Sequence, residues 1–131
     1  METQKTKKVH ADDLHFEHKL WANQLNFYRD ELVILQNRLD EVARRNNEKE
    51  VTIKIEQFQN KLTIQNGHLV KLRHEVQDSE KQLAASAEKN PIAFDHHLFQ
   101  DHEGERKKIE VFATLYAELK QDFYKFVAEW L

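Results

Sequence analysis

Cysteine is absent from this sequence of 131 residues, which also contains only 2 Gly and 1 Pro. Without cysteine there is no disulfide framework, no thiol nucleophile and no thiolate ligand for zinc or an iron–sulfur cluster. So few turn-forming residues exclude a β-sandwich or β-barrel of many short strands. No uninterrupted apolar run approaches the roughly 18 residues that cross a bilayer, and no secretion signal is recognised. We therefore expect a cytoplasmic protein without membrane contact.

The sequence also lacks a dominant charge, because 23 acidic side chains stand against 20 basic ones and the two signs alternate along the chain. The basic clusters at 44–45 and 106–108 are not interleaved with aromatic residues, so no nucleic-acid partner is expected. The two serines, Ser79 and Ser86, lie outside any nucleophile-elbow motif, and no glycine-rich phosphate loop is present. We expect no enzymatic activity and no small-molecule substrate.

What the sequence does contain is a regular apolar pattern. In three segments, apolar residues recur in alternating steps of three and four, as in coiled-coil helices. The seam residues are Leu14, Trp21, Leu25, Tyr28, Leu32, Leu35, Leu39 and Val42 in the first segment, Val51, Ile55, Phe58, Leu62, Leu69, Leu72, Val76 and Leu83 in the second, and Ile109, Phe112, Tyr116, Leu119, Phe123, Phe126 and Trp130 in the third. A second row on the first helix, at Leu20, Phe27 and Ile34, widens its apolar face.

Local signals set the expected helix boundaries. Asp12 or Asp13 is a good cap for the first helix, which leaves residues 1–11 as a flexible N-terminal tail. The first turn is expected near residues 46–49. Asn90-Pro91 is expected to start the third helix, because Asn caps well and proline is tolerated in the first turn.

Two glycines lie inside the expected helices. The apolar repeat keeps its phase across Gly67, which predicts one continuous second helix, whereas Gly104 is expected to kink the third and set off a short leading helix. Short connections make neighbouring helices antiparallel. The sequence therefore predicts a single all-α domain over residues 1–131, an up-down-up antiparallel three-helix bundle of long coiled-coil-like helices.

This topology gathers histidines at one end of the bundle. The cluster comprises His15, His18, His96, His97 and His102. The heptad phase singles out His18, Asp95 and His102 as able to meet. Imidazole and carboxylate groups together suit zinc or another divalent cation. The favoured alternative is a polar layer that fixes helix register without any cofactor.

A further acid, Glu105, occupies a seam position of the third helix. Antiparallel pairing about the Asn90 turn is expected to bring it near His74, as a buried Glu–His pair. The Glu-x-x-His motif of carboxylate-bridged di-iron bundles is absent from the sequence, which argues against that class.

Several segments of the first and third helices carry a family likeness. They are Glu17-His18-Lys19-Leu20-Trp21 with Asn23, Leu25, Phe27-Tyr28 and Asp30-Glu31, then Asn90-Pro91, Asp95-His96, Phe99 and Asp101-His102, and finally Phe112, Tyr116, Glu118-Leu119-Lys120, Phe123, Phe126 and Trp130. In these segments the chain resembles a family of small, uncharacterised bacterial helical-bundle proteins. The resemblance implies a cytoplasmic helical bundle and no particular reaction or ligand.

Two functional hypotheses follow. The first is a non-enzymatic bundle that acts through protein contacts, either as a homo-oligomer or by docking a partner helix, since Phe16, Phe27 and Phe99 flank the seam and need cover. The second is a divalent-metal or pH-sensing bundle that uses the His/Asp cluster at one end.

Overall fold

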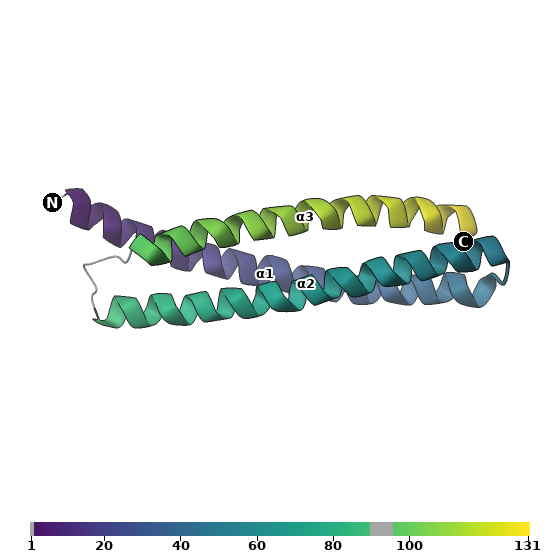
Figure 1. Cartoon of the computed structure of the whole chain (residues 1–131), viewed down its shortest axis with the longest axis horizontal. Coiled ribbons are helices and arrows are strands. Elements are labelled where there is room, and N and C mark those ends of the chain that lie inside the picture. Colours follow the sequence, from purple (N-terminus) through teal and green to yellow (C-terminus); the bar gives the residue numbers. More distant parts are fainter. Residues whose placement is uncertain (1, 90–95) are drawn as a thin grey trace. The chain divides into compact units, whose positions relative to one another are not determined.

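The computed structural model of this chain describes residues 2–89 and 96–131, and it describes side chains for residues 12–88 and 100–131. The described residues form three helices, α1 (Glu2–Arg45), α2 (Lys49–Lys89) and α3 (His96–Trp130), with no strand among them (Figure 1). The fold is an all-α, up-down-up three-helix bundle, which confirms the predicted class. No helix in the described part of the chain has an apolar stretch long enough to span a bilayer.

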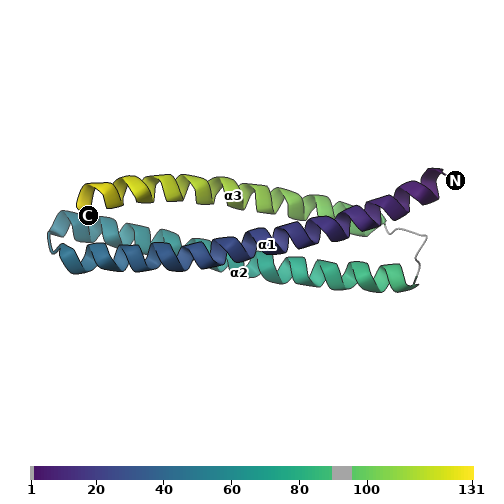
Figure 2. The same cartoon turned by 180° about the vertical axis from the view of Figure 1, so that it is seen from behind.

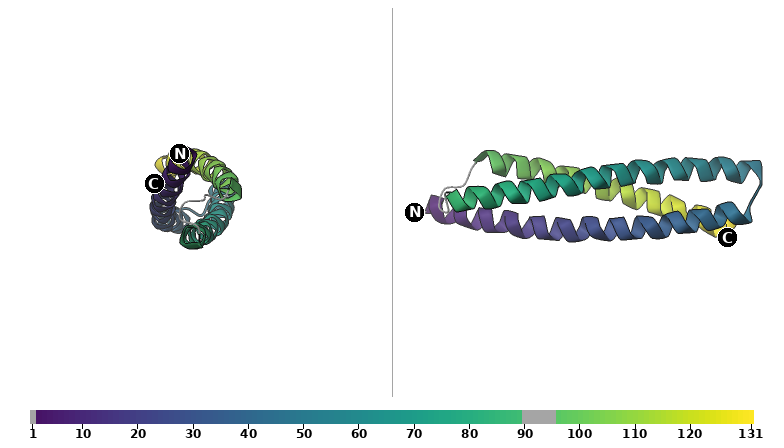
Figure 3. Two further views of the ribbon diagram at one scale, coloured as in Figure 1. Left: turned by 90° about the vertical axis from the view of Figure 1, so that its left-hand side faces the viewer. Right: turned by 90° about the horizontal axis from the view of Figure 1, so that it is seen from below.

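Contacts between residues divide the chain into two compact units. Unit 1 comprises Met1–Leu25 and Lys71–Glu110, and unit 2 comprises Asn26–Val70 and Val111–Leu131. Each unit therefore contains one segment of α1, one of α2 and one of α3. Within each unit the three segments lie side by side, with α2 antiparallel to the other two (Figures 2 and 3).

The predicted seam forms the core of both units. In unit 1 the buried apolar residues are Leu14, Trp21, Leu25, Leu72, Val76, Leu83 and Ile109. In unit 2 they are Leu32, Leu35, Leu39, Val42, Val51, Phe58, Leu62, Leu69, Phe112, Tyr116, Leu119, Phe123 and Phe126. Three further seam residues, Tyr28, Ile55 and Trp130, are half-buried. Each fully buried leucine or phenylalanine contributes roughly 1.5–3 kcal/mol through removal of apolar surface from water.

The first helix starts earlier than its capping signals predict. It begins at Glu2, so the expected start at Asp12 or Asp13 is wrong, and residues 2–11 belong to the helix. Those residues include no glycine or proline, and glutamate, lysine, glutamine and alanine favour helix continuation. Residues 2–11 therefore contain no signal that interrupts the helix between Glu2 and Asp12.

The first turn lies where it was predicted, between Arg45 and Lys49. The Asn46 side-chain amide donates hydrogen bonds to the Val42 carbonyl at 3.0 Å and to the Trp130 carbonyl at 3.2 Å. One amide thus caps the end of α1 and also contacts the end of α3. In this way the Asn46 side chain supplies donors to two helix-terminal carbonyls.

Both internal glycines lie within continuous helices. α2 runs through Gly67, as predicted, and α3 is one helix through Gly104, so the separate leading helix expected there is wrong. One glycine costs a helix only about 1 kcal/mol, which the packed seam on either side offsets. The predicted start of the third helix at Asn90-Pro91 lies outside the described residues.

Candidate metal centre

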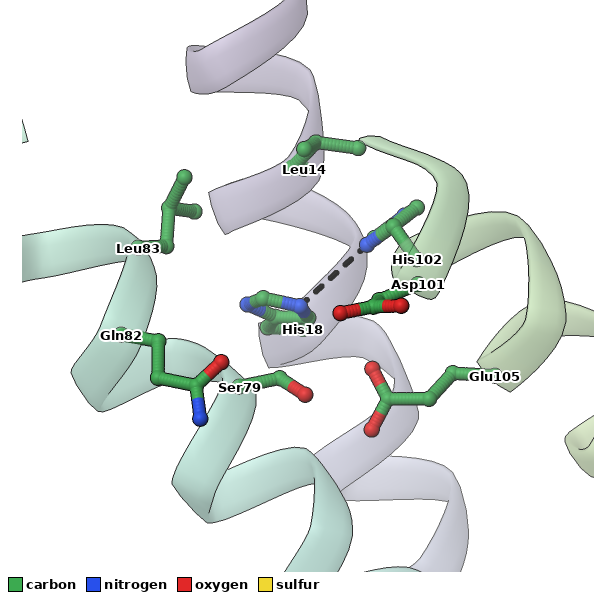
Figure 4. Close-up of a pocket in the computed structure, with 8 residues that line it drawn as sticks. All are labelled: Leu14, His18, Ser79, Gln82, Leu83, Asp101, His102 and Glu105. Atoms are coloured by element: carbon green, nitrogen blue, oxygen red, sulfur yellow. Dashed lines mark hydrogen bonds between the residues drawn. The ribbon is translucent and has the colours of Figure 1, made fainter. Parts of the chain in front are cut away.

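Three buried ionisable side chains converge in unit 1. They are His18 of α1 and His102 and Glu105 of α3, with 4%, 2% and 7% of their surface exposed. One ligand atom from each lies within 4.8 Å of the other two (Figure 4). The structure thus brings together His18 and His102, as the heptad phase predicted, whereas Asp95 lies outside the described residues. Among the residues described, the third donor is Glu105.

The other clustered histidines divide into two groups. His15 is exposed and hydrogen-bonds to Glu80, so it lies beside the three buried groups and not among them. The side chains of His96 and His97 lie outside the described residues.

Helix geometry explains why these residues meet. His102 and Glu105 are three residues apart on α3, so their side chains leave the same face of that helix. His18 occupies a core position on α1, one turn before Trp21. The Trp21 indole stacks on the His102 imidazole with ring centroids 4.5 Å apart and planes 26° apart, which fixes the orientation of the histidine ring.

Each imidazole has a carboxylate on its outer nitrogen. His18 Nδ1 lies 2.5 Å from Glu80 Oε2 of α2, and His102 Nε2 lies 3.0 Å from Glu17 Oε1 of α1. An ionised carboxylate only accepts hydrogen bonds, so both outer nitrogens carry the hydrogen. Arg106 donates to both oxygens of Glu17, from Nε at 3.0 Å and from the terminal nitrogen. This guanidinium lowers the pKa of Glu17 and keeps it an acceptor.

The two inner nitrogens face each other. His18 Nε2 and His102 Nδ1 are 3.3 Å apart. With a hydrogen on each outer nitrogen, the neutral forms of both rings carry lone pairs on their inner nitrogens, which lie within hydrogen-bond distance of each other. Burial lowers the pKa of His102, although Glu17 opposes this effect, so the neutral ring is favoured. Two converging lone pairs attract a cation.

Glu105 completes the group as an acid without a partner. Both of its carboxylate oxygens are buried, and neither accepts a hydrogen bond from any residue that the structure describes. Burial raises the pKa of Glu105, and the nearby Ser79 hydroxyl offsets this only in part. The predicted Glu105–His74 pair is wrong, because His74 is exposed. The Glu105 carboxyl instead lies on the same side of α3 as His102 and faces the α1–α2 side (Figure 4).

The three groups border a small cavity. It is lined by Leu14, His18, Ser79, Gln82, Leu83, Asp101, His102 and Glu105. Its volume is about 10 Å³. That is about the space that one water molecule needs. The cavity is thus about the size of a single ion or water molecule.

The contacts of Glu17 and Glu80 with the two imidazoles were not predicted from the sequence. Glu17 and Glu80 occupy positions that flank the apolar seams of their helices. In the sequence they look like any other half-exposed acidic residue. Their roles depend on which imidazole each one reaches across the helix interface.

No family model, curated protein or solved structure matches this chain. The resemblance to small bacterial helical-bundle proteins therefore stays a prediction. Conclusions about function depend on the geometry of the centre itself.

Proposed function

We propose that this bundle binds one divalent transition-metal ion, with zinc as the reference ion, through His18, His102 and Glu105. The observation that carries the proposal is the pair of facing nitrogens, His18 Nε2 and His102 Nδ1, each left without a hydrogen by a carboxylate on the opposite side of its ring.

The separation of the nitrogens suits a shared metal. Zinc binds histidine nitrogen at about 2.0–2.1 Å, and two ligands at a tetrahedral angle are then about 3.3–3.4 Å apart. The observed separation of His18 Nε2 and His102 Nδ1 is 3.3 Å. Glu105 supplies a third, anionic ligand from within 4.8 Å. A water molecule in the adjoining cavity would supply a fourth ligand.

The outer contacts have the form found around metal-bound histidines. Such histidines usually donate their other N–H to a carboxylate, a carbonyl or water, which fixes the tautomer and raises ligand basicity. Here Glu80 serves His18 and Glu17 serves His102, and Arg106 holds Glu17 in place. Glu17 and Glu80 are thus positioning residues.

The donor types narrow the choice of ion. Two imidazoles with one carboxylate suit zinc and iron(II), whereas magnesium and calcium prefer oxygen ligands alone. Because the cavity has room for about one water, the ion has no space to act on an organic substrate. A binding or sensing role fits this better than catalysis does.

The alternatives leave groups unsatisfied. A proton shared between the two rings would occupy the space between the nitrogens, but it would leave the Glu105 carboxyl buried without a partner. A purely structural polar layer has the same defect, because buried polar groups in stable layers are normally all hydrogen-bonded. A cation satisfies all three groups at once.

Zinc titration followed by calorimetry tests the proposal. We expect one tight site per chain, a loss of at least about 100-fold in affinity for His102→Gln, and a loss of about 10–100-fold for Glu17→Gln. His74→Gln, which removes an exposed imidazole, is the matched control and should bind like the unmodified chain. Circular dichroism verifies that each variant is helical.

Cobalt(II) gives a second measurement. Its visible absorption should show low-symmetry, near-tetrahedral coordination in the unmodified chain and lose that signature in His18→Gln. Zinc binding no tighter than that of exposed histidines, or equal binding by His102→Gln and the control, contradicts the proposal.

A second candidate function is self-association through α1. Phe27 and Ile34 lie seven residues apart on that helix, within unit 2, and are 57% and 64% exposed. Exposed apolar side chains at helical spacing favour a protein contact. Light scattering across a concentration series should then give a mass above 15.7 kDa that Ile34→Lys lowers and Val70→Lys, on α2, does not. A monomer at every concentration contradicts this candidate.

A further inference from the structure

The two units differ in what they bury. All of the buried polar side chains among the described residues, His18, His102 and Glu105, belong to unit 1. They form one layer of its core, with apolar residues such as Leu14 and Ile109 on either side along the helices. In the absence of a cation this layer contains two facing lone pairs and an orphan carboxyl.

Unit 2 has a core without such a layer. Phe58 stacks on Phe126 with ring centroids 4.9 Å apart and meets Phe123 edge-on at 5.6 Å. Glu31, a half-buried acid of this unit, accepts hydrogen bonds from Tyr116 at 2.6 Å and from Lys120 at 3.0 Å.

The remaining unpartnered atoms of the described chain are also of a different kind. They are Gln65 Oε1 and Trp130 Nε1, both in unit 2 and both on neutral side chains. Each of these side chains leaves a single neutral atom unpaired, whereas in unit 1 both oxygens of the Glu105 carboxyl lack a partner in the same layer as the two facing imidazole nitrogens.

This difference predicts unequal local stability. Burying an ionisable group without a partner is costly, and proteins open first where such costs concentrate. Unit 1 should therefore open more readily than unit 2 when no metal is bound.

A bound ion would act on unit 1 alone. Its ligands come from α1 and α3, at positions 18 and 102, and α2 contributes Glu80, which holds His18. Such ligands come together only when all three segments of unit 1 are packed. An ion that binds the packed state and not the open one stabilises the packed state by mass action.

From these observations we infer that the metal is a local ordering switch, which closes unit 1 while unit 2 is folded with or without it. This inference depends on the metal site proposed above, and it states what metal binding changes in the protein, namely the order of unit 1. A partner or process that recognises packed unit 1 would then respond to metal availability. Regulation acts through the order of residues 12–25, 71–88 and 100–110.

Hydrogen exchange of the full chain, followed by mass spectrometry, tests the switch. In chelator, we expect amides of unit 1 to exchange at least about tenfold faster than those of unit 2. At free zinc 100 times the dissociation constant, exchange through opening of unit 1 should slow by up to about 100-fold, with less than about twofold change in unit 2. His102→Gln should remove the zinc effect, and His74→Gln should retain it.

The outcomes separate the two proposals. Equal exchange of the two units in chelator overturns the switch, whatever zinc does. Zinc that binds by calorimetry but protects both units equally, or neither, also overturns the switch and leaves the metal site standing. If calorimetry detects no specific binding, the metal site fails and the switch fails with it. If zinc still slows exchange in His102→Gln, the ordering does not arise from this centre, and the switch proposed here is overturned.

Discussion

Replacing Glu105 with leucine should stabilise the metal-free protein while it weakens metal binding. The carboxyl is buried and both of its oxygens lack a hydrogen-bond partner among the described residues. A buried polar group without a partner costs about 1–3 kcal/mol, and an apolar side chain of similar size removes that cost. Position 105 is part of the α3 seam, where leucine packs as its neighbours do.

The size of the effect can be stated as a melting temperature. For a chain of 131 residues, 1 kcal/mol corresponds to about 4 °C, so Glu105→Leu should raise Tm in chelator by about 4–12 °C. Thermal unfolding followed by circular dichroism at neutral pH measures it. Glu118→Leu, at an exposed position of the same helix, is the matched control and should change stability by no more than about 0.5 kcal/mol.

In zinc, the unmodified chain should become more stable than the Glu105→Leu variant, which is the reverse of their order in chelator. The unmodified chain should gain stability in proportion to the logarithm of free zinc, whereas the Glu105→Leu variant keeps only two imidazole ligands and should gain much less. A lower Tm for Glu105→Leu than for the unmodified chain in chelator would refute the reasoning. It would mean that the carboxyl makes a stabilising interaction in the metal-free state.

Three further predictions concern the rest of the bundle. Burial and the hydrogen bond to Glu31 raise the pKa of Tyr116, so the folded state holds that proton above pH 10 while the unfolded state releases it, and stability should fall from about pH 10 upward. Urea unfolding from pH 9 to 12 should show a shallower fall for Tyr116→Phe, and an unchanged slope would count against the assignment. Phe123→Ala, at a fully buried site, should cost about 3–5 kcal/mol by urea unfolding, and a cost below 1 kcal/mol would contradict its place in the core. Gly67→Ala should stabilise α2 by about 1 kcal/mol, because a Cβ there meets nothing within 4 Å, and a lower Tm would oppose this account.

The sequence predicted the fold and the core well because a single physical rule governs both. In a long helix, a residue every three or four positions faces the neighbouring helices, so Leu25 and Phe123 could be assigned to the interior from spacing alone. The same rule placed His18 and His102 in one core layer. It also kept α2 continuous through Gly67, because a turn would have shifted the phase of the repeat.

The rest of the centre was beyond this rule. Heptad phase says which side of a helix faces inward, but the axial register between antiparallel helices depends on their connections and on side-chain fit. That register decides that Glu105 does not pair with His74 and that Glu80 reaches His18. Capping preferences likewise indicate where a helix can start but not where it must start. Residues 2–11 contain no helix breaker, so α1 begins at Glu2 and not at Asp12.

The stacking of Trp21 on His102 equips the protein with its own optical probe. The chain has two tryptophans, and the other, Trp130, belongs to unit 2. Indole emission responds to the electronic state of a ring in van der Waals contact. The fluorescence of Trp21 would therefore change when His102 binds a proton or a metal ion. With Trp130 changed to phenylalanine, the fluorescence of an unlabelled sample would follow this one end of the molecule alone.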